Sequence, residues 1–283
     1  MAFIYATLRG FIHIGAFYVV WIFSCFIIPV SFYMYFFYDN KLPILALVLY
    51  YGYRMVVPRK PWPWIHNLAI SNQENNNYFR KQELIFEEKI EPDSSNLICF
   101  HPHGILTAGW IVNGNTRSEF YDARVVFMVV ETLFYIPIIS DIAIFNNTWP
   151  ATKYEMVTRM EKKQNLALLP GGFEEATLYR NGRHRVFIKQ RKGFVKYALQ
   201  NGYKLVPTYT FGEERTYWAF SWLSKKLKFL NKYKIPTVFF IGKYLLAPND
   251  NVSLITVVGS PLQLPRIEEP TDADVDEWHG KYV

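Results

Sequence analysis

The feature that most constrains this chain is a long uncharged segment near its N-terminus. Residues 10–38 contain no Asp, Glu, Lys or Arg, and this stretch exceeds the roughly 20 apolar residues that a helix needs to cross a bilayer core. A second apolar run, 42–53, follows a polar turn that begins at Asp39; it is short for a complete span. A signal peptide would have a shorter apolar core and a small-residue cleavage site. We therefore expect a transmembrane or re-entrant helical hairpin over residues 1–58.

Positive charges on both sides of the hairpin predict its orientation. Arg9 precedes it, and Arg54, Arg59 and Lys60 follow it. The positive-inside rule then places both flanks in the cytosol. Two cysteines in the whole chain make no disulfide framework, which agrees with reducing surroundings. The alternative interpretation is a hairpin buried in the core of a soluble protein.

Overall composition points to an anionic partner. Lys and Arg total 31 against 24 acidic residues, for a net charge of +7, and aromatic residues make up 18% of the chain. Such a basic, aromatic-rich chain is typical of proteins that bind nucleic acid, a membrane surface or a phosphorylated ligand.

Residues 59–283 alternate short apolar runs with amphipathic stretches such as 152–164 and 190–201. This alternation predicts an α/β domain with a mostly parallel central sheet. Ligands of such sheets gather at the carboxyl ends of the strands. Unusual turns follow three of the expected strands: HPHG after the first, PGG after the third and FGEE after the fourth. The expected strands are 96–100, 125–130, 166–169, 204–209, 237–241 and 254–258.

The HPHG turn contains the first candidate catalytic residues, His101 and His103. A histidine at a strand end can act as a general base on a hydroxyl. We favour His103, because Gly104 beside it leaves room for a substrate. A zinc site would need three or four nitrogen or sulfur ligands, and the other histidines are scattered. Two packed, structural histidines are the remaining alternative.

The PGG turn offers main-chain N–H groups to an anion. Gly171 and Gly172 follow an apolar run, and such a turn can form a nest for a developing oxyanion. Glu174 and Glu175 come next, and one of them can orient an imidazole or bind an acceptor hydroxyl. Glu213 in the FGEE turn is assigned to the same substrate-binding group. A plain helix start with acids in its first turn explains the glutamates equally well.

A basic run without an acid occupies residues 180–196. Arg binds phosphate in bidentate fashion and Lys binds it as a point charge. Nucleic acid is the usual partner of a basic run, but a hairpin-bearing α/β domain favours a phosphorylated ligand or anionic headgroups. A solvated face is the alternative for any single residue. The basic residues are Arg180, Arg183, Arg185, Lys189, Arg191, Lys192 and Lys196.

Five sequence blocks in this order make the chain resemble the type-2 diacylglycerol acyltransferase family, which includes monoacylglycerol acyltransferases and wax-ester synthases. The resemblance covers roughly residues 60–283, and the N-terminal hairpin is similar as well. The blocks are HPHG, PGG-x-x-EA (170–176), RKGFVKYAL (191–199), LVPTYTFGE (205–213) and VVGSPLQLP (257–265).

The resemblance implies transfer of a fatty acyl group from acyl-CoA to the free hydroxyl of diacylglycerol or a similar neutral lipid. It also implies the endoplasmic reticulum membrane or lipid droplets, with the catalytic domain in the cytosol. Acyl-CoA is a co-substrate, and neither a cofactor, a metal nor nucleic acid is required. It assigns His101, His103 and Glu175 to catalysis, and Arg191, Lys192, Gly193, Arg185 and Lys189 to acyl-CoA.

The chain departs from the wider pattern in two places. Glycerolipid acyltransferases pair their histidine with an Asp five positions on, where this chain has Leu106 and Ala108, so we take Glu175 as the orienting group. The family's YFP tract lacks its proline here, where Arg80 stands. Family members also continue beyond the C-terminal EWHGKYV, so we expect a truncated C-terminus.

The sequence leaves the acceptor open between diacylglycerol, monoacylglycerol and a fatty alcohol. A lysophospholipid acyltransferase would need the missing His/Asp pair and a second phosphate site. A non-catalytic hairpin protein that coats lipid droplets is the alternative from another class.

Overall fold

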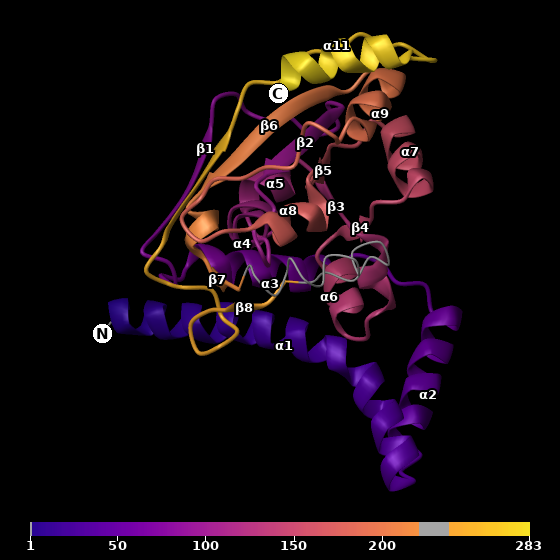
Figure 1. Cartoon of the computed structure of the whole chain (residues 1–283), viewed down its shortest axis with the longest axis vertical. Helices are drawn as coiled ribbons and strands as arrows, with labels where there is room; N and C mark the ends of the chain where they lie inside the picture. The colour runs from indigo at the N-terminus through magenta and orange to yellow at the C-terminus, as the bar shows by residue number, and fades with distance from the viewer. Residues whose placement is uncertain (1, 221–237) are drawn as a thin grey trace.

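The computed structural model in Figure 1 describes residues 2–220 and 238–283. An apolar helical hairpin precedes an α/β domain, and a C-terminal helix lies at the end of the molecule opposite the hairpin (Figure 1). The elements are α1 (Ala2–Tyr38), α2 (Leu42–Val56), α3 (Pro63–Glu74), β1 (Lys81–Phe86), β2 (Asn96–His101), α4 (Ala108–Trp110), η1 (Ile111–Asn115), α5 (Ser118–Asp122), β3 (Val126–Val129), η2 (Glu131–Tyr135), α6 (Ile139–Phe145), β4 (Thr148–Pro150), α7 (Lys153–Glu161), β5 (Leu166–Leu168), α8 (Gly172–Leu178), α9 (Gly193–Asn201), β6 (Lys204–Phe211), η3 (Glu213–Arg215), β7 (Trp218–Ala219), β8 (Phe240–Ile241), β9 (Ser253–Val258) and α11 (Asp272–Tyr282).

A seven-stranded sheet forms the centre of the domain, in the order β1-β9-β6-β2-β5-β3-β4. Strands β6, β2, β5, β3 and β4 run parallel to one another. Strands β9 and β1 also run parallel to each other, and β9 meets β6 in antiparallel pairing. The mostly parallel sheet and the α/β class are therefore as predicted.

Five of the six expected strands are part of this sheet, whereas 237–241 is not. Strand β8 from that segment pairs only with β7, outside the central sheet, and Thr237 lies outside the described residues. Two strands of the central sheet were not expected, and neither was β7 outside it. Strand β1 has charged residues and a half-exposed pattern, and β4 is three residues long and ends in Pro150. Both lie at sheet edges, where alternation and length are weak signals.

Helices cover the sheet on both faces. Helix α9 buries Val195 and Leu199, which are four residues apart, in a core cluster with α7, α11 and strands β2 and β5. This spacing places both side chains on one face of the helix. The opposite face of the sheet packs against Trp110 and Phe120 from α4 and α5. Each such buried side chain stabilises the domain by about 1.5–3 kcal/mol.

Helix α1 runs beneath the α/β domain and then bends away to pair with α2 (Figure 1). Ile14 and Tyr18 are buried against the domain, and Pro29, a residue type that kinks helices, lies further along α1. Beyond it the apolar side chains are exposed; Phe36, for example, is 71% exposed. Among the described residues, one helical segment, Ile14–Tyr38, is long and apolar enough to cross a membrane, and α2 is a shorter apolar helix.

Candidate active site

The three turns singled out in the sequence lie together at the carboxyl ends of three neighbouring central strands. Strand β2 lies between β5 and β6 and runs parallel to both, so their carboxyl ends point the same way. The turns after these strands carry His103, Glu175 and Glu213. Main-chain N–H groups of the HPHG turn and of the short helix α4 that follows it donate to carboxylates of the other two turns: His103 to Glu175 at 2.6 Å, and Gly109 to Glu213 at 2.6 Å.

The ring of His103 is held by its own turn. Its Nδ1 lies 3.1 Å from the carbonyl oxygen of Gly104. A carbonyl oxygen only accepts hydrogen bonds, so in the neutral ring Nδ1 bears the proton and Nε2 is an unprotonated acceptor. Gly104 adopts φ +64°, and a Cβ there would lie 2.1 Å from Oε1 of Glu213, so only glycine fits this position.

Burial lowers the pKa of His103, and the Gly104 carbonyl and the carboxylates of Glu175 and Glu174 offset only part of that effect. The imidazole is consequently neutral at physiological pH. A neutral ring with a free Nε2 is the form that can accept a proton.

Glu175 supports the main chain of the site. Its side chain is 1% exposed; one oxygen accepts from the N–H of His103 and the other from the N–H of Phe187 at 2.7 Å. Oε1 also lies 3.8 Å from Nδ1 of His101. Burial opposes ionisation of Glu175, but His101 and the two N–H donors outweigh burial, and the pKa of Glu175 is lowered. The structure thus differs from the expectation that Glu175 orients the His103 ring: the Gly104 carbonyl bonds that ring.

His101 is buried beside the C-terminal helix. It is 8% exposed, and its Nε2 lies 3.0 Å from the hydroxyl of Tyr282 in α11. The two histidines of the HPHG turn therefore have different surroundings, one against the C-terminal helix and one at a cavity.

That cavity, of about 830 Å³, is lined by His103 but not by His101. Its volume falls in the range of roughly 300–1,000 Å³ that is usual for small-molecule sites. Part of its wall is α1, with Ile14, Phe17, Tyr18 and Trp21. The wall also includes Glu174, Arg191, Lys192 and Gly193, where α9 begins. Most of the wall is apolar. An apolar chain and a charged head can therefore occupy the same cavity.

The sequence model described as diacylglycerol acyltransferase matches residues 33–283. The chain belongs to this family.

Individual relatives support the assignment. Diacylglycerol O-acyltransferase 2-like protein 6 from Homo sapiens is 33% identical over 248 residues, which cover 78% of this chain and 72% of the relative. 2-acylglycerol O-acyltransferase 3 from Homo sapiens is 29% identical, covering 78% and 70%. Diacylglycerol O-acyltransferase 2 from Dictyostelium discoideum is 29% identical, covering 73% and 69%. The resemblance read from the five sequence blocks is thereby confirmed.

Among solved structures, the 1-acyl-sn-glycerophosphate acyltransferase PlsC from Thermotoga maritima aligns with 100% of this chain and 96% of its own length. The TM-score is 0.46 and the sequence identity 13%, too low for the likeness to bear on fold or function.

In the PGG turn, a main-chain N–H group that we expected to be available to an anion already has a hydrogen-bond acceptor within the protein. The N–H of Gly172 donates to the carbonyl of Leu169 at 3.1 Å, so it is engaged within the turn. Gly172 lines the cavity. A Cβ at Gly171 would lie 1.9 Å from the Glu175 carboxylate, so Gly171 is required for the close approach of Glu175 to the turn.

The basic residues assigned to acyl-CoA separate into two groups. Arg191 and Lys192 line the cavity and are paired with carboxylates, Arg191 with Glu174 and Lys192 with Asp276. Arg185 and Lys189 lie outside that cavity. Arg185 has a long contact, 3.5 Å, with the Leu178 carbonyl, and Lys189 lines a smaller pocket beside α11 that Lys192 shares.

Glu213 does not line the cavity, contrary to the expected substrate contact. It is 1% exposed and accepts from the N–H groups of Ala108 at 3.1 Å and Gly109 at 2.6 Å. These are first-turn donors of a short helix, which have no partner within the helix. Burial raises the pKa of Glu213 to about 8. Its observed role is to fix the chain after the HPHG turn.

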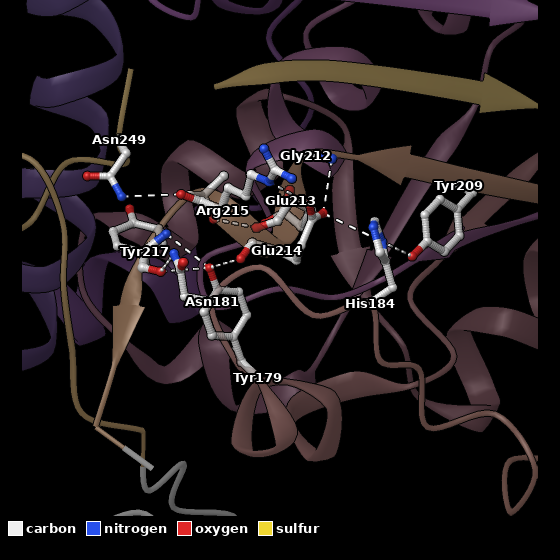
Figure 2. Close-up of polar contacts among 11 residues, drawn as sticks. Tyr179, Asn181, His184, Tyr209, Gly212, Glu213, Glu214, Arg215, Tyr217 and Asn249 are labelled. Atoms are coloured by element: carbon white, nitrogen blue, oxygen red, sulfur yellow. Dashed lines mark hydrogen bonds and ion pairs between the residues drawn. The ribbon is translucent and has the colours of Figure 1, made fainter. Parts of the chain in front are cut away.

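The neighbouring Glu214 belongs to the group of polar contacts shown in Figure 2, in which Glu213 also appears. One of its oxygens accepts from the N–H of Gly212 at 3.0 Å and lies 3.7 Å from Nδ1 of His184. That nitrogen is 2.9 Å from the hydroxyl of Tyr209. This cluster fixes the start of the basic segment to the end of β6.

Within residues 2–220 and 238–283, no group of three or more His, Cys, Asp or Glu side chains is placed to hold a metal ion. Two groups at the site were not foreseen: the Gly104 carbonyl, which sets the tautomer of His103, and the Tyr282 hydroxyl. Tyr282 is 181 positions from His101, and no local pattern signals such a contact.

Proposed function

We propose that this protein is an acyl-CoA-dependent O-acyltransferase that esterifies the free hydroxyl of diacylglycerol and forms triacylglycerol. The observation that carries the proposal is the state of His103: a neutral ring whose Nδ1–H donates to Gly104 and whose Nε2 is free. This ring lies on a mostly apolar cavity that Arg191 and Lys192 also line. A base, room for acyl chains and cations for an anionic carrier fit this reaction class.

In the proposed reaction, Nε2 of His103 takes the proton of the acceptor hydroxyl while its oxygen attacks the thioester carbonyl. The tetrahedral intermediate collapses, the carbon–sulfur bond breaks, and the imidazolium returns the proton to the CoA thiolate. We assign the oxyanion to the N–H of Gly172, which lines the cavity and has to exchange its bond to the Leu169 carbonyl for the oxyanion. Glu175 fixes the main chain at His103. The steps use acyl-CoA as co-substrate and no further cofactor, and we expect a metal chelator to leave the rate unchanged.

The phosphates of CoA are assigned to Arg191 and Lys192, which have to exchange their carboxylate partners for phosphate oxygens. Gly193, where α9 begins, gives the ligand close access to the backbone. Arg185 and Lys189, outside the cavity, are assigned to the distal part of the carrier, which extends over the basic segment.

We further propose that residues 1–58 form a membrane hairpin and that residues 59–283 form the catalytic domain on the cytosolic side of the endoplasmic reticulum or of lipid droplets. The exposed apolar side chains at the bend of the hairpin support this, because water would not cover them favourably. Helix α2 has 15 residues, a length of ~22 Å at 1.5 Å per residue. This is shorter than a bilayer core of about 30 Å, so we propose a re-entrant hairpin.

The test is acyl transfer by membranes that contain the full chain, with labelled acyl-CoA and an acceptor panel of diacylglycerol, monoacylglycerol and fatty alcohol. We expect triacylglycerol as the main product and a loss of about 10²–10⁴-fold in His103→Ala, the range of general-base contributions. Tyr154→Ala, which removes an exposed ring outside the cavity, is the control and should retain activity. The identity to 2-acylglycerol O-acyltransferase 3 favours monoacylglycerol as the second candidate acceptor. A wild type that esterifies none of these acceptors would refute the acyltransferase assignment.

A further inference from the structure

The C-terminal helix α11 presents one face to the catalytic domain. Val275, His279 and Tyr282 are four and three residues apart, a spacing that aligns them on one side of a helix. Val275 and His279 are buried, and Nε2 of His279 lies 3.0 Å from the carbonyl of Ile188. The ring of Tyr282 packs edge-on against Phe194 of α9, with centroids 5.2 Å apart. This packing directs the Tyr282 hydroxyl toward the end of β2.

The hydroxyl of Tyr282 lies 3.0 Å from Nε2 of His101. The other ring nitrogen, Nδ1, lies 3.8 Å from Oε1 of Glu175, which is an ion-pair distance rather than a hydrogen bond. A carboxylate so close favours the tautomer with its proton on Nδ1. Nε2 is then a lone pair inside the protein, where an acceptor without a donor is unfavourable.

Tyr282 can supply that donor. Burial raises the pKa of its hydroxyl, so the phenol keeps its proton across the physiological range. Its single proton can therefore be donated to Nε2 of His101. The opposite side of the same ring faces the carboxylate that accepts from the N–H groups of His103 and Phe187.

We propose that Tyr282 is a positioning residue of the active site: its hydroxyl fixes the ring of His101 with the Nδ1 proton toward Glu175, and Glu175 in turn holds the turn that carries His103. The inference rests on the proposed acyl transfer for its kinetic consequence. It gives His101 a role distinct from that of the base, and it makes α11 a structural part of the site. This chain lacks the Asp that follows the histidine in other glycerolipid acyltransferases. In the proposal Tyr282 supports the HPHG turn in its place, but it bonds the ring of His101 and not that of His103.

A purely structural role for Tyr282 is the competing explanation, and Tyr203 provides the matched control. The hydroxyl of Tyr203 is also enclosed, and it donates to main-chain carbonyls of Met160 at 3.3 Å and Gln164 at 2.7 Å. Tyr203 belongs to the core cluster against which Tyr282 packs, but it does not line the cavity. Tyr203→Phe should lower the unfolding temperature and leave kcat unchanged.

The kinetic test is a double-mutant cycle on the full chain in detergent, followed with labelled acyl-CoA and the preferred acceptor. We expect Tyr282→Phe to lower kcat about tenfold, within the 10²-fold that a misplacement of about 1 Å can cost, with the KM for acyl-CoA unchanged. In a His101→Asn background the same substitution should change kcat less than about twofold. An equal loss in both backgrounds, or no loss in either, would overturn the proposal.

A second measurement does not depend on turnover. Nitrogen-15 NMR spectra of protein with labelled histidine rings, recorded at pH 8, report the tautomer directly. The His101 signals are identified by their absence in His101→Asn. We expect the Nδ1–H tautomer in the wild type and a displaced Nε2 signal in Tyr282→Phe but not in Tyr203→Phe. A wild-type proton on Nε2, or a His101 signal indifferent to Tyr282→Phe, would refute the positioning role. If the wild type transfers no acyl group, the proposed function fails, and these spectra alone decide the inference.

Discussion

Replacing Glu175 by Gln tests whether the centre of the site depends on a carboxylate. The two oxygens accept from different main-chain donors, the N–H of His103 at 2.6 Å and that of Phe187 at 2.7 Å. Glutamine has one oxygen and one NH₂ group, so one of these donors must face another donor. A hydrogen bond to a charged group is worth about 1.5–3 kcal/mol, and an unsatisfied buried donor costs about 1–3 kcal/mol. We therefore expect Glu175→Gln to reduce the free energy of unfolding by about 2.5–6 kcal/mol, the sum of these two contributions.

The substitution should also reduce turnover. When the N–H of His103 loses its acceptor, the turn that aims Nε2 is no longer fixed, and a displacement of about 1 Å lowers the rate by about 10²-fold. The KM for acyl-CoA should change little, because Arg191 and Lys192 are not bonded to Glu175.

Both effects can be measured on the detergent-solubilised full chain, by thermal unfolding and by initial rates with labelled acyl-CoA. Asn165→Ala is a control at the opposite edge of the sheet, where Asn165 accepts from the N–H of Asn96 at 3.1 Å and donates to the carbonyl of Ala123 at 2.9 Å. It should lose stability and keep its kcat below its unfolding temperature. Wild-type turnover in Glu175→Gln, or an equal fall of kcat in Asn165→Ala, would show that the carboxylate does not support the catalytic turn.

Three further results are expected. Because burial lowers the pKa of His103, the acidic limb of the kcat/KM profile should lie below the ordinary histidine value of about 6.5; a limb above 7 would contradict His103 as the base. The folded-state pKa of Glu213, about 8, is above its ordinary value of 4.5, so the folded protein holds this proton more tightly and loses stability as pH rises between these values. The unfolding temperature should therefore decline over that window, and Glu213→Gln should flatten the decline; parallel curves would contradict this. Trp21→Ala, which enlarges the cavity at α1, should shift a series of acyl-CoA chain lengths toward longer chains, whereas Phe36→Ala on the exposed part of α1 should not.

The sequence predicted those parts of the site that depend on strand ends. Apolar runs identify β2, β5 and β6, and the rule that parallel strands end at one edge then brings their turns together without any knowledge of the pairing. The same rule correctly placed Glu213 near the carboxyl ends of these strands. It does not predict the direction of a side chain, and the carboxylate of Glu213 accepts from two buried main-chain N–H groups instead of lining the cavity.

The hydrogen-bond partner of the His103 ring could not be predicted from the sequence for a similar reason. A carboxylate near an imidazole is a pattern of residue types, whereas the acceptor of the His103 Nδ1 proton is a main-chain carbonyl, which every residue possesses. Gly104, which supplies this carbonyl, has a positive φ that residues with a side chain rarely adopt. The glycine itself was visible in HPHG, but the sequence suggested a different use for it, space for substrate.

The course of α1 connects the two regions that the sequence treated separately. Residues 10–38 are uncharged and predicted a membrane hairpin, yet Ile14, Phe17 and Trp21 lie on the wall of the cavity that His103 also lines. The transfer of a neutral diacylglycerol from a bilayer to water is unfavourable, because it exposes apolar surface. Helix α1 packs on the α/β domain through Ile14 and Tyr18 and then continues into an exposed apolar hairpin. Under the proposed function, this helix would connect the bilayer to the cavity that His103 lines. Under the proposed function, membrane attachment and substrate delivery then depend on the same helix, and changes to its inner face should alter catalysis without releasing the protein from membranes.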